Sequence, residues 1–367
     1  MKVLVLGAGI IGASVADALA ARGADVTVFE MRSPGRGASQ ASAGMLAPYA
    51  ESHGDPRLLE LCTRSLDLFD DVIARLIDDT GRPVEYARTG TLEVALDATE
   101  ADALLAVKRH LDAAGVAAEW MDGPAVRAFE PTLATSAVGG LFTRVHGYVA
   151  VDPFLRALVH RAMFAGATFQ SPVEAASVEQ RGDVVEVDTG DCVHRADAVV
   201  IATGSWSRRV RVKHVAAIPV RPVRGQLLTL RWHGDGPPRR IVWGTGCYVV
   251  PWADGTLLVG ATMEEAGFEE CTTVRGIQSL TSAVSALVPL AGGAHLDAVR
   301  VGLRPMLPDG LPAIGPIARA PRVTVATGHF RNGVLLTPLT AQLVSRYVLD
   351  GVEDDAFALT TPNRFLS

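Results

Sequence analysis

The first 30 residues constrain the fold more than any other part of the chain. An apolar run from Val3 to Leu6 leads into Gly7-Ala8-Gly9-Ile10-Ile11-Gly12, and a second apolar run, Ala24 to Phe29, ends at Glu30. Strand, glycine turn, helix, strand and acid in this order match the G-x-G-x-x-G fingerprint of dinucleotide-binding folds. The sequence therefore predicts a βαβ unit that holds the ADP half of a dinucleotide.

Each position of the fingerprint has a physical role. Gly7 permits the tight turn out of the strand, Gly9 lets the backbone approach a pyrophosphate, and Gly12 lets the helix pack closely on the sheet. The helix that starts at Ile10 offers free N–H groups and a partial positive charge to the phosphates. Glu30 can accept hydrogen bonds from the ribose hydroxyls, and its charge disfavours the 2′-phosphate of NADP.

Length and composition limit the class of protein. A chain of 367 residues, 49% of them hydrophobic, can form two domains with a sizeable core. A net charge of −6 does not suggest a nucleic-acid partner, and no apolar run is long enough to span a membrane. The four cysteines have no metal-binding spacing, and the first strand leaves no room for a signal peptide. We therefore expect a cytoplasmic protein with reduced thiols and no metal centre.

Three later segments are similar to the flavin-dependent D-amino-acid oxidase family. They are Ser42-Ala43-Gly44-Met45-Leu46; Gly302-Leu303-Arg304-Pro305 followed by Pro308 to Gly315; and Gly328-His329-Phe330-Arg331-Asn332-Gly333-Val334-Leu335. With the fingerprint, they follow the family's order over essentially the whole chain. Within the family, Cys247 to Pro251 and Val259 to Met263 look most like the glycine oxidases of the thiamine pathway.

The resemblance implies an α/β (α+β) fold with two domains. A Rossmann-like FAD-binding domain is expected from residues 1–50, 144–218 and 300–367, and an inserted antiparallel-sheet domain that binds substrate from 51–143 and 219–299. Within these domains, apolar periodicity predicts one helix from Arg57 to Asp79 and another that starts at Asp152-Pro153 with Asp152 as its N-cap. Val173 to Glu179 is predicted as a strand.

FAD is the cofactor that the resemblance implies. It is expected to be non-covalent, because no cysteine lies between Gly302 and Asp309, where related sarcosine oxidases attach the flavin. The small residues from Ala38 to Met45 suit a loop against a flat ring, and a helix N-terminus after Gly328 could stabilise the reduced flavin anion. The residues carried over as FAD-binding are Gly7, Gly9, Ile10, Ile11, Gly12, Glu30, Met31, Ala38, Ser39, Ala43, Gly44, Met45, Val173, Gly204, Gly328, His329, Phe330, Arg331, Asn332, Gly333, Val334 and Leu335.

An amino acid is the implied substrate. Arg304 matches the arginine that clamps the substrate carboxylate, and Tyr248 matches a tyrosine that hydrogen-bonds the same group. Arg331 and Met263 match positions on the substrate side. The alternatives are an ion pair for Arg304, a sheet aromatic for Tyr248, a backbone cap for Arg331 and core packing for Met263. No residue is predicted as a catalytic acid or base, and His329 is interpreted as fixed by contacts within its turn.

The implied reaction is the oxidative deamination of glycine, sarcosine or a small D-amino acid by hydride transfer from Cα to the flavin. The imino acid then hydrolyses to an oxo acid and ammonia, and dioxygen reoxidises the flavin with formation of hydrogen peroxide. One alternative is a D-amino-acid or hydroxyproline dehydrogenase with another electron acceptor. Another is a non-catalytic nucleotide-binding module, which Arg304 and Tyr248 disfavour.

The sequence departs from the family's pattern at one place. Glycine oxidases carry Gly-Thr after the Arg-Pro pair, whereas this chain has Met306-Leu307. Two apolar side chains next to Arg304 would favour a substrate with an apolar body, unless the pair faces away from the site. The oligomeric state stays open, a homo-oligomer included.

Overall fold

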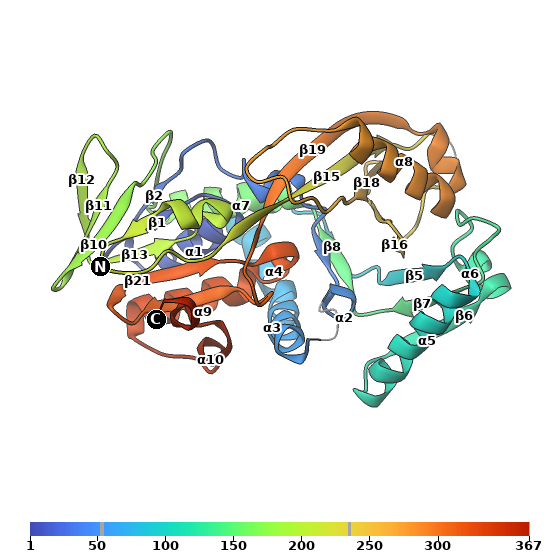
Figure 1. The fold of residues 1–367 in the computed structure, drawn as a ribbon, viewed down its shortest axis with the longest axis horizontal. Coiled ribbons are helices and arrows are strands. Elements are labelled where there is room, and N and C mark those ends of the chain that lie inside the picture. The colour runs from blue at the N-terminus through green and yellow to red at the C-terminus, as the bar shows by residue number, and fades with distance from the viewer. Residues whose placement is uncertain (52–54, 234–235, 367) are drawn as a thin grey trace.

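A six-stranded sheet organises one half of the molecule (Figure 1). The computed structural model describes residues 1–51, 55–233 and 236–366. In this sheet β1, β2, β9, β13 and β21 pair in parallel, and β20 pairs antiparallel at one edge. The strand order is β20 (Ala313–Ile317), β21 (Ala320–Thr327), β13 (Ala198–Ile201), β1 (Lys2–Leu6), β2 (Asp25–Phe29) and β9 (Thr168–Gln170).

Both faces of this sheet are covered, which explains why its strands are apolar throughout. Val3 and Val5 face a core formed with the helices, whereas Leu4 and Leu6 face a small sheet. The helices are α1 (Ile10–Ala20), α3 (Pro56–Asp67), α4 (Phe69–Thr80), α7 (Val151–Phe164), α9 (Thr337–Asp350) and α10 (Ala356–Thr360). The small sheet has the order β12 (Val193–Ala196), β11 (Val184–Asp188), β10 (Ser177–Arg181) and β14 (Arg211–Val212).

An eight-stranded, largely antiparallel sheet forms the other half. Helix α8 (Val274–Leu287) packs on one face through Leu280 and Val284, while α5 (Ala98–Ala113) and α6 (Gly123–Phe129) lie beside its far strands. The strand order is β19 (His295–Met306), β15 (Arg221–Arg231), β18 (Thr256–Gly260), β17 (Cys247–Pro251), β16 (Ile241–Gly244), β5 (Thr91–Ala95), β7 (Gly139–Thr143) and β6 (Ala118–Asp122).

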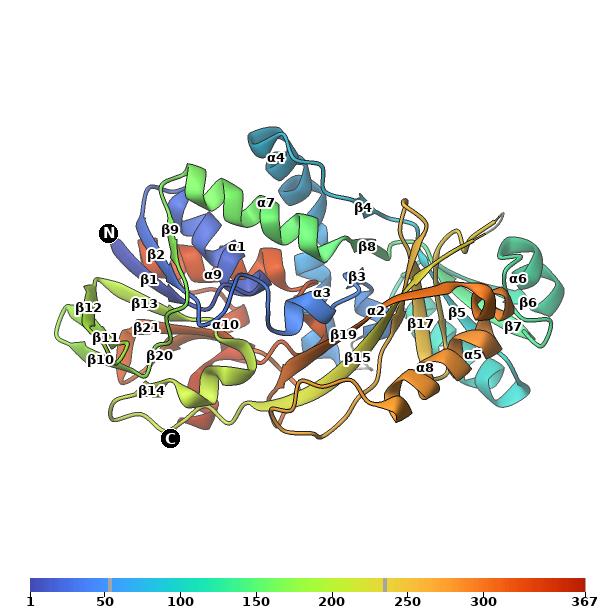
Figure 2. The same cartoon turned by 90° about the horizontal axis from the view of Figure 1, so that it is seen from above.

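Two connections join the halves. Strands β15 and β19 pair along their whole length, from Arg221 opposite Met306 to Arg231 opposite His295, and Figure 2 shows them crossing the middle of the molecule. The second connection is a three-stranded sheet of β3 (Met45–Leu46), β8 (Gly147–Val149) and β4 (Tyr86–Ala87), next to α2 (Pro48–Glu51). Short 3₁₀ turns complete the fold at Ala38–Ala41, Gly204–Arg209, Pro289–Gly293, Phe330–Asn332 and Pro362–Phe365.

The expected α/β class, with one parallel and one antiparallel sheet, is confirmed, while the exact domain bounds stay a prediction. Some local predictions were wrong. The predicted helix 57–79 is two helices that meet at Leu68, because apolar residues such as Leu66 and Phe69 continue the pattern across the break. Helix α7 begins before Asp152, with Ala150 as N-cap. Val173 precedes the strand in which it was predicted.

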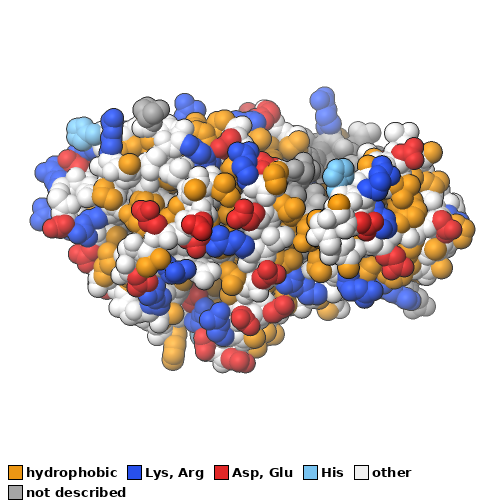
Figure 3. Space-filling view, turned by 90° about the horizontal axis from the view of Figure 1, so that it is seen from below, with side chains coloured by type: hydrophobic (Ala, Val, Ile, Leu, Met, Phe, Trp, Pro, Cys, Tyr) orange, Lys and Arg blue, Asp and Glu red, His pale blue; other side chains and the backbone are white. Residues whose placement is uncertain are grey.

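The outer surface carries charges of both signs. Figure 3 shows acidic and basic side chains interspersed over both lobes of one face. Along the described part of the chain, no helix combines the length and the apolar character that crossing a membrane requires.

Candidate active site

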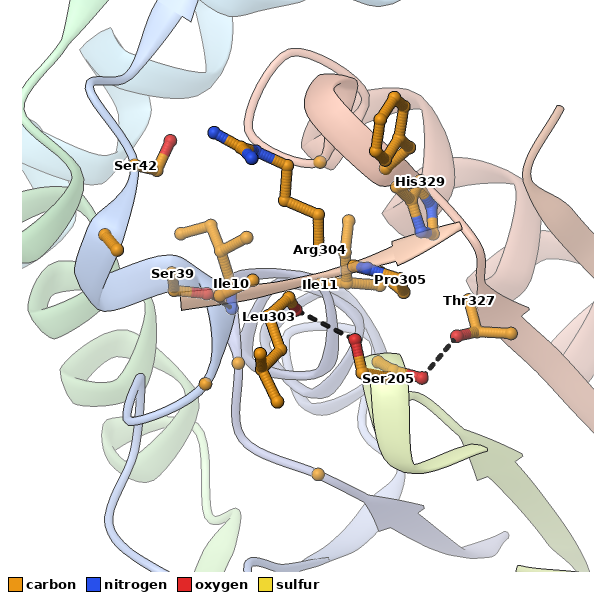
Figure 4. Close-up of a pocket in the computed structure, with 18 of the residues that line it drawn as sticks. Ile10, Ile11, Ser39, Ser42, Ser205, Leu303, Arg304, Pro305, Thr327 and His329 are labelled. Carbon is orange, nitrogen blue, oxygen red and sulfur yellow. Dashed lines mark hydrogen bonds between the residues drawn. The ribbon is translucent and has the colours of Figure 1, made fainter. Parts of the chain in front are cut away.

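A cavity of about 560 Å³ lies where the two large sheets meet. The carboxyl ends of β1, β2, β13 and β21 open into it, and the loop after β2 forms one wall (Figure 4). The opposite wall comes from β17, β18 and β19. Open parallel sheets bind their ligands at the carboxyl ends of the strands, so this cavity is the candidate active site.

The three fingerprint glycines meet different surroundings. Gly7 has φ +99°, and a Cβ there would lie 2.6 Å from the Ala202 carbonyl oxygen. A Cβ on Gly12 would lie 1.9 Å from the Gly7 carbonyl oxygen, so helix α1 packs directly on the turn. A Cβ on Gly9 would meet only the Ser39 Oγ, at 3.5 Å. The space beside Gly9 therefore belongs to the cavity, as the approach of a pyrophosphate requires.

Glu30 is fixed across this turn. Its Oε2 accepts a hydrogen bond from the Ala8 N–H at 2.7 Å, and its Oε1 accepts one from the Arg32 N–H at 2.8 Å. A carboxylate has further lone pairs, so these bonds orient Glu30 and leave acceptor capacity for ribose hydroxyls. Close by, the Ile10 N–H at the start of α1 donates to Ser39 Oγ at 3.0 Å.

The loop from residue 38 to 45 forms a wall of small side chains. A Cβ on Gly302 of β19 would lie 2.9 Å from the Ala41 Cβ, so the loop rests directly on that strand. Gly44 has φ +73°, and a Cβ there would lie 1.8 Å from the Val149 carbonyl oxygen. The glycine turn, the acid and this wall together fit the ADP half and the flat ring of FAD.

Most of the predicted cofactor residues line the cavity. Gly12, Gly328, Asn332 and Leu335 do not belong to its lining within the described part of the chain. Gly328 packs on Leu307, and Leu335 lies in the core under α9. The predicted residues that do line it are Gly7, Gly9, Ile10, Ile11, Glu30, Met31, Ala38, Ser39, Ala43, Gly44, Met45, Val173, Gly204, His329, Phe330, Arg331, Gly333 and Val334, together with Tyr248, Met263 and Arg304.

Arg304 extends from β19 into the cavity (Figure 4). Its guanidinium lies over Gly225 of the neighbouring strand, where a Cβ would be 2.3 Å from Nη1. Nη1 donates to the Thr262 carbonyl at 2.9 Å, and no carboxylate of the described residues lies within ion-pair distance. Burial lowers the pKa of Arg304, but a guanidinium stays protonated in proteins. The site thus holds a half-buried cation for which no described residue supplies an anionic partner.

Tyr248 reaches the same space from β17. Gly260 makes room for it, because a Cβ on that glycine would lie 2.4 Å from the phenol oxygen. Burial raises the pKa of Tyr248 to about 12, so the hydroxyl is protonated near neutral pH. Since this hydroxyl makes no hydrogen bond to any described residue, it is available to a ligand.

Sequence reasoning missed two residues beside Arg331. The Nε of Arg331 lies 2.8 Å from Oε2 of Glu51, and its guanidinium lies 5.6 Å from the ring of Trp243. Burial raises the pKa of Glu51, while Arg331 opposes that rise. A carboxylate in the otherwise small and apolar stretch after Met45 is a signal that could have marked Glu51.

Glu93 lies next to Trp243, one of the residues that contact Arg331. It is the register partner of Trp243 on β5, and its carboxyl makes no hydrogen bond to a described residue. Burial, and then the charge of Glu51, raise the pKa of Glu93 to about 7. The inner face of the sheet therefore holds, besides Glu51, an acid whose pKa lies near neutrality.

His329 is a neutral, fixed residue. Burial lowers its pKa to about 3, and its Nε2 lies 3.0 Å from the Thr340 Oγ1. The partner is a side chain of α9 rather than the turn's own backbone. An imidazole held in this way is poorly placed to act as a base.

Met306 and Leu307 do not form the substrate wall that their position suggested. Neither side chain belongs to the cavity lining within the described residues. Leu307 is buried in the core against the parallel sheet, and the Met306 Sδ accepts from Nη2 of Arg221 at 3.2 Å. Strand β19 ends at Met306, and the chain then turns into the core of the parallel sheet, where Leu307 is buried.

Comparison with known proteins agrees with this geometry. The family model described as FAD dependent oxidoreductase matches residues 2–347. The chain is 31% identical over 347 residues to a glycine oxidase of Geobacillus kaustophilus (strain HTA426), covering 94% of this chain and 92% of that protein. The crystal structure of glycine oxidase from Geobacillus kaustophilus matches with a TM-score of 0.93 and 30% identity, over 100% of both chains.

A second group of relatives is longer. The chain is 32% identical over 356 residues to the bifunctional protein ThiO/ThiG of Nostoc sp. (strain PCC 7120), covering 96% of this chain and 53% of that protein. The chain spans about half the length of this protein and of two other bifunctional relatives.

The different surroundings of Gly9 and Gly12 predict different effects of substitution. Gly9→Val should fold, because its φ of −68° suits any residue and its side chain would enter the cavity, but it should not bind FAD. Gly12→Ala should destabilise the protein by about 2 kcal/mol or more, because its Cβ would collide with the Gly7 carbonyl. Thermal unfolding in the absence of added FAD measures the stability of each variant, and the flavin content of the purified protein measures FAD binding. Full flavin content in Gly9→Val would contradict the assignment.

Glu93 predicts a pH dependence of stability. Its pKa is about 7 in the folded protein against 4.5 in a free chain, so the folded state holds the proton more tightly. The free energy of unfolding should therefore fall by about 1–3 kcal/mol as pH rises from 5 to 8. Glu93→Gln should remove this fall and be more stable than the wild type at pH 8. Denaturant unfolding at both pH values checks it, with the exposed Glu119→Gln of β6 as control.

Proposed function

The chain belongs to the family of FAD-dependent oxidoreductases, and we propose that within it this enzyme oxidatively deaminates a small amino acid. The observation that carries the proposal is the half-buried guanidinium of Arg304, which faces the cavity without a carboxylate partner among the described residues. Removing part of a cation's hydration costs free energy, which a ligand that supplies the anion would offset. The similarity to glycine oxidases supports an α-amino acid as that ligand.

The cofactor of this enzyme is FAD. Its placement is part of the proposal: the pyrophosphate beside Gly9, the adenosine ribose at Glu30, and the flavin ring between the 38–45 loop and the segment that starts at His329. The free space at Gly9 and the two backbone bonds that orient Glu30 support this placement. We propose that FAD is held without a covalent bond, because no cysteine lies between Gly302 and Asp309, the stretch that contains Arg304.

Two donors from neighbouring strands define the proposed carboxylate site. Arg304 offers the planar fork that matches a carboxylate, and Tyr248 offers a protonated hydroxyl that no described residue engages. Gly225 leaves the space that the Arg304 guanidinium occupies, and Gly260 leaves the space that the Tyr248 hydroxyl occupies. Such a clamp orients the substrate Cα relative to the cofactor, which is a large share of catalysis in a reaction that needs no covalent protein intermediate.

When bound, FAD supplies the hydride acceptor for the substrate Cα–H bond. The side chains around it hold and shield the substrate rather than move its protons. His329 stays neutral on Thr340, and Glu51 is paired with Arg331. Trp243 and Met263 provide apolar walls. The expected product is an imino acid, which water converts to an oxo acid and ammonia.

Glycine is the first substrate to test, with sarcosine and small D-amino acids next. The position of Met306 and Leu307 outside the cavity lining removes the reason to expect a larger apolar substrate. Dioxygen is the proposed acceptor of the electrons. The test mixes the FAD-loaded protein with each amino acid without oxygen and follows the visible flavin absorbance. Bleaching by an amino acid and peroxide formation in air are expected; a flavin that only dithionite bleaches would refute the proposal.

Removing the clamp should lower kcat/KM without loss of cofactor. Arg304→Ala should cost roughly 2–5 kcal/mol, or about 30- to 5,000-fold in kcat/KM, because the substrate carboxylate would be buried without a partner. Arg304→Lys keeps the charge but loses the fork, so it should recover only part of the activity. Arg300→Ala on the same strand is the control, because Arg300 lies against Trp252 outside the cavity lining. Near-normal kcat/KM in Arg304→Ala would rule out the clamp.

Tyr248→Phe should show a smaller loss of the same kind. It removes one neutral hydrogen bond, worth about 0.5–1.5 kcal/mol, or roughly 2- to 12-fold in kcat/KM. Steady-state kinetics with saturating FAD measure the loss. An unchanged kcat/KM would show that the hydroxyl does not touch the substrate.

A further inference from the structure

The segment from residue 264 to 271, here called the strap, connects the antiparallel sheet to the far end of the cavity. It follows β18, which ends at Gly260, and precedes helix α8, which packs on the same sheet. Its first residue, Glu264, is held on β15. The backbone of Glu264 forms a β-bridge with Arg224, and its carboxylate accepts hydrogen bonds from Arg224 at 2.6 Å and from Gln226 at 2.7 Å. The strap therefore starts from a rigid point on β15.

The other end of the strap contacts the dinucleotide half through Phe268. The guanidinium of Arg209 lies 4.0 Å from the centre of the Phe268 ring, and the Trp206 ring lies 5.9 Å from it. Both Arg209 and Trp206 line the cavity, whereas Phe268 does not belong to its lining within the described residues. Phe268 thus supports the cavity wall from behind.

Glu270 makes a second contact with that half. Its Oε2 lies 2.5 Å from Nη1 of Arg32, and the Arg32 guanidinium in turn lies 4.8 Å from the Trp206 ring. The other oxygen of Glu270, Oε1, is buried and has no hydrogen-bond partner among the described residues. Arg32 is therefore the group that offsets the burial of this carboxylate.

These contacts meet at one end of the cavity. Arg32 lines the cavity and its backbone N–H holds Glu30, the residue proposed to bind the adenosine ribose. Arg32, Trp206 and Arg209 therefore surround the space next to that ribose, and the strap backs all three. The strap belongs to the half of the molecule that carries the proposed substrate clamp.

We propose that the strap retains the adenosine half of FAD, with Phe268 and Glu270 as positioning residues that hold Trp206, Arg209 and Arg32 in place. This proposal rests on the proposed placement of the adenosine ribose at Glu30. It makes the antiparallel sheet a contributor to cofactor affinity as well as to substrate binding. The Trp206 ring and the guanidinium groups of Arg32 and Arg209 line the cavity there and offer adenine a stacking surface.

The test compares Phe268→Ala and Glu270→Gln with the wild type. Release of FAD from the full-length, FAD-loaded enzyme is followed by the rise in flavin fluorescence, and we expect roughly 5- to 20-fold faster release. FAD and FMN are then titrated into the same proteins after cofactor removal. Because FMN lacks adenosine, its affinity should not change. Phe268→Trp should restore slow release.

Glu265→Gln is the matched control. Glu265 lies in the strap and carries the same charge, but it pairs with Arg221 outside the cavity lining. Its FAD release should equal that of the wild type. If Phe268→Ala does not fold, salt provides the second measurement: about 0.5 M salt should speed FAD release from the wild type but not from Glu270→Gln.

Two results would overturn the proposal. Release at the wild-type rate in both variants would show that the strap does not retain FAD. An equal loss of FAD and FMN affinity would show that it only stabilises the fold. Glu30→Gln separates this failure from that of the placement. If Glu30→Gln weakens FAD but not FMN, the adenosine ribose lies at Glu30 whatever the strap does; if it weakens neither, the placement itself is wrong.

Discussion

The arrangement of the site depends on two glycines that face each other across β15 and β19. Gly225 and Gly302 are register partners, and the missing side chains leave a shelf on one face of the paired strands. The 38–41 turn lies over Gly302, and the Arg304 guanidinium lies over Gly225. A side chain at either glycine would displace the cofactor wall or the clamp. The missing side chains of these two glycines therefore set the position of the cofactor wall and of the clamp.

Electrostatics give the two ends of the cavity different characters. At the proposed substrate end, Arg304 and Arg331 share the space with Glu51, and Arg304 has no anionic partner of its own among the described residues. A ligand carboxylate would complete that balance. At the other end, Glu30 and Glu270 both hold Arg32, through its backbone and its side chain respectively. An acceptor for hydroxyl groups thus lies at one end and a cation for a carboxylate at the other.

The sequence predicts the parts of this structure that follow from local rules. The turn at Gly7, the helix after it and the strand that ends at Glu30 are determined by periodicity and backbone freedom, so the sequence pattern is enough. Glu51 and Trp243 escaped prediction because their importance comes from Arg331, which is distant in sequence. Met306 and Leu307 were misplaced because spacing does not reveal where a strand ends and turns. The break at Leu68 is likewise invisible to periodicity.

The shelf also has a stereochemical consequence. Gly302 lies under the 38–41 turn, and its register partner Gly225 lies under the Arg304 guanidinium, so the wall and the guanidinium sit over neighbouring strands about 4.8 Å apart. If the ring lies on the wall above Gly302 and the carboxylate on Arg304, as proposed, the two paired strands fix the distance between them. At this distance, the carbon bonded to the carboxylate is the one that faces the ring. A β-amino acid would present the wrong carbon at that distance, so the backbone itself discriminates between α- and β-substituted acids.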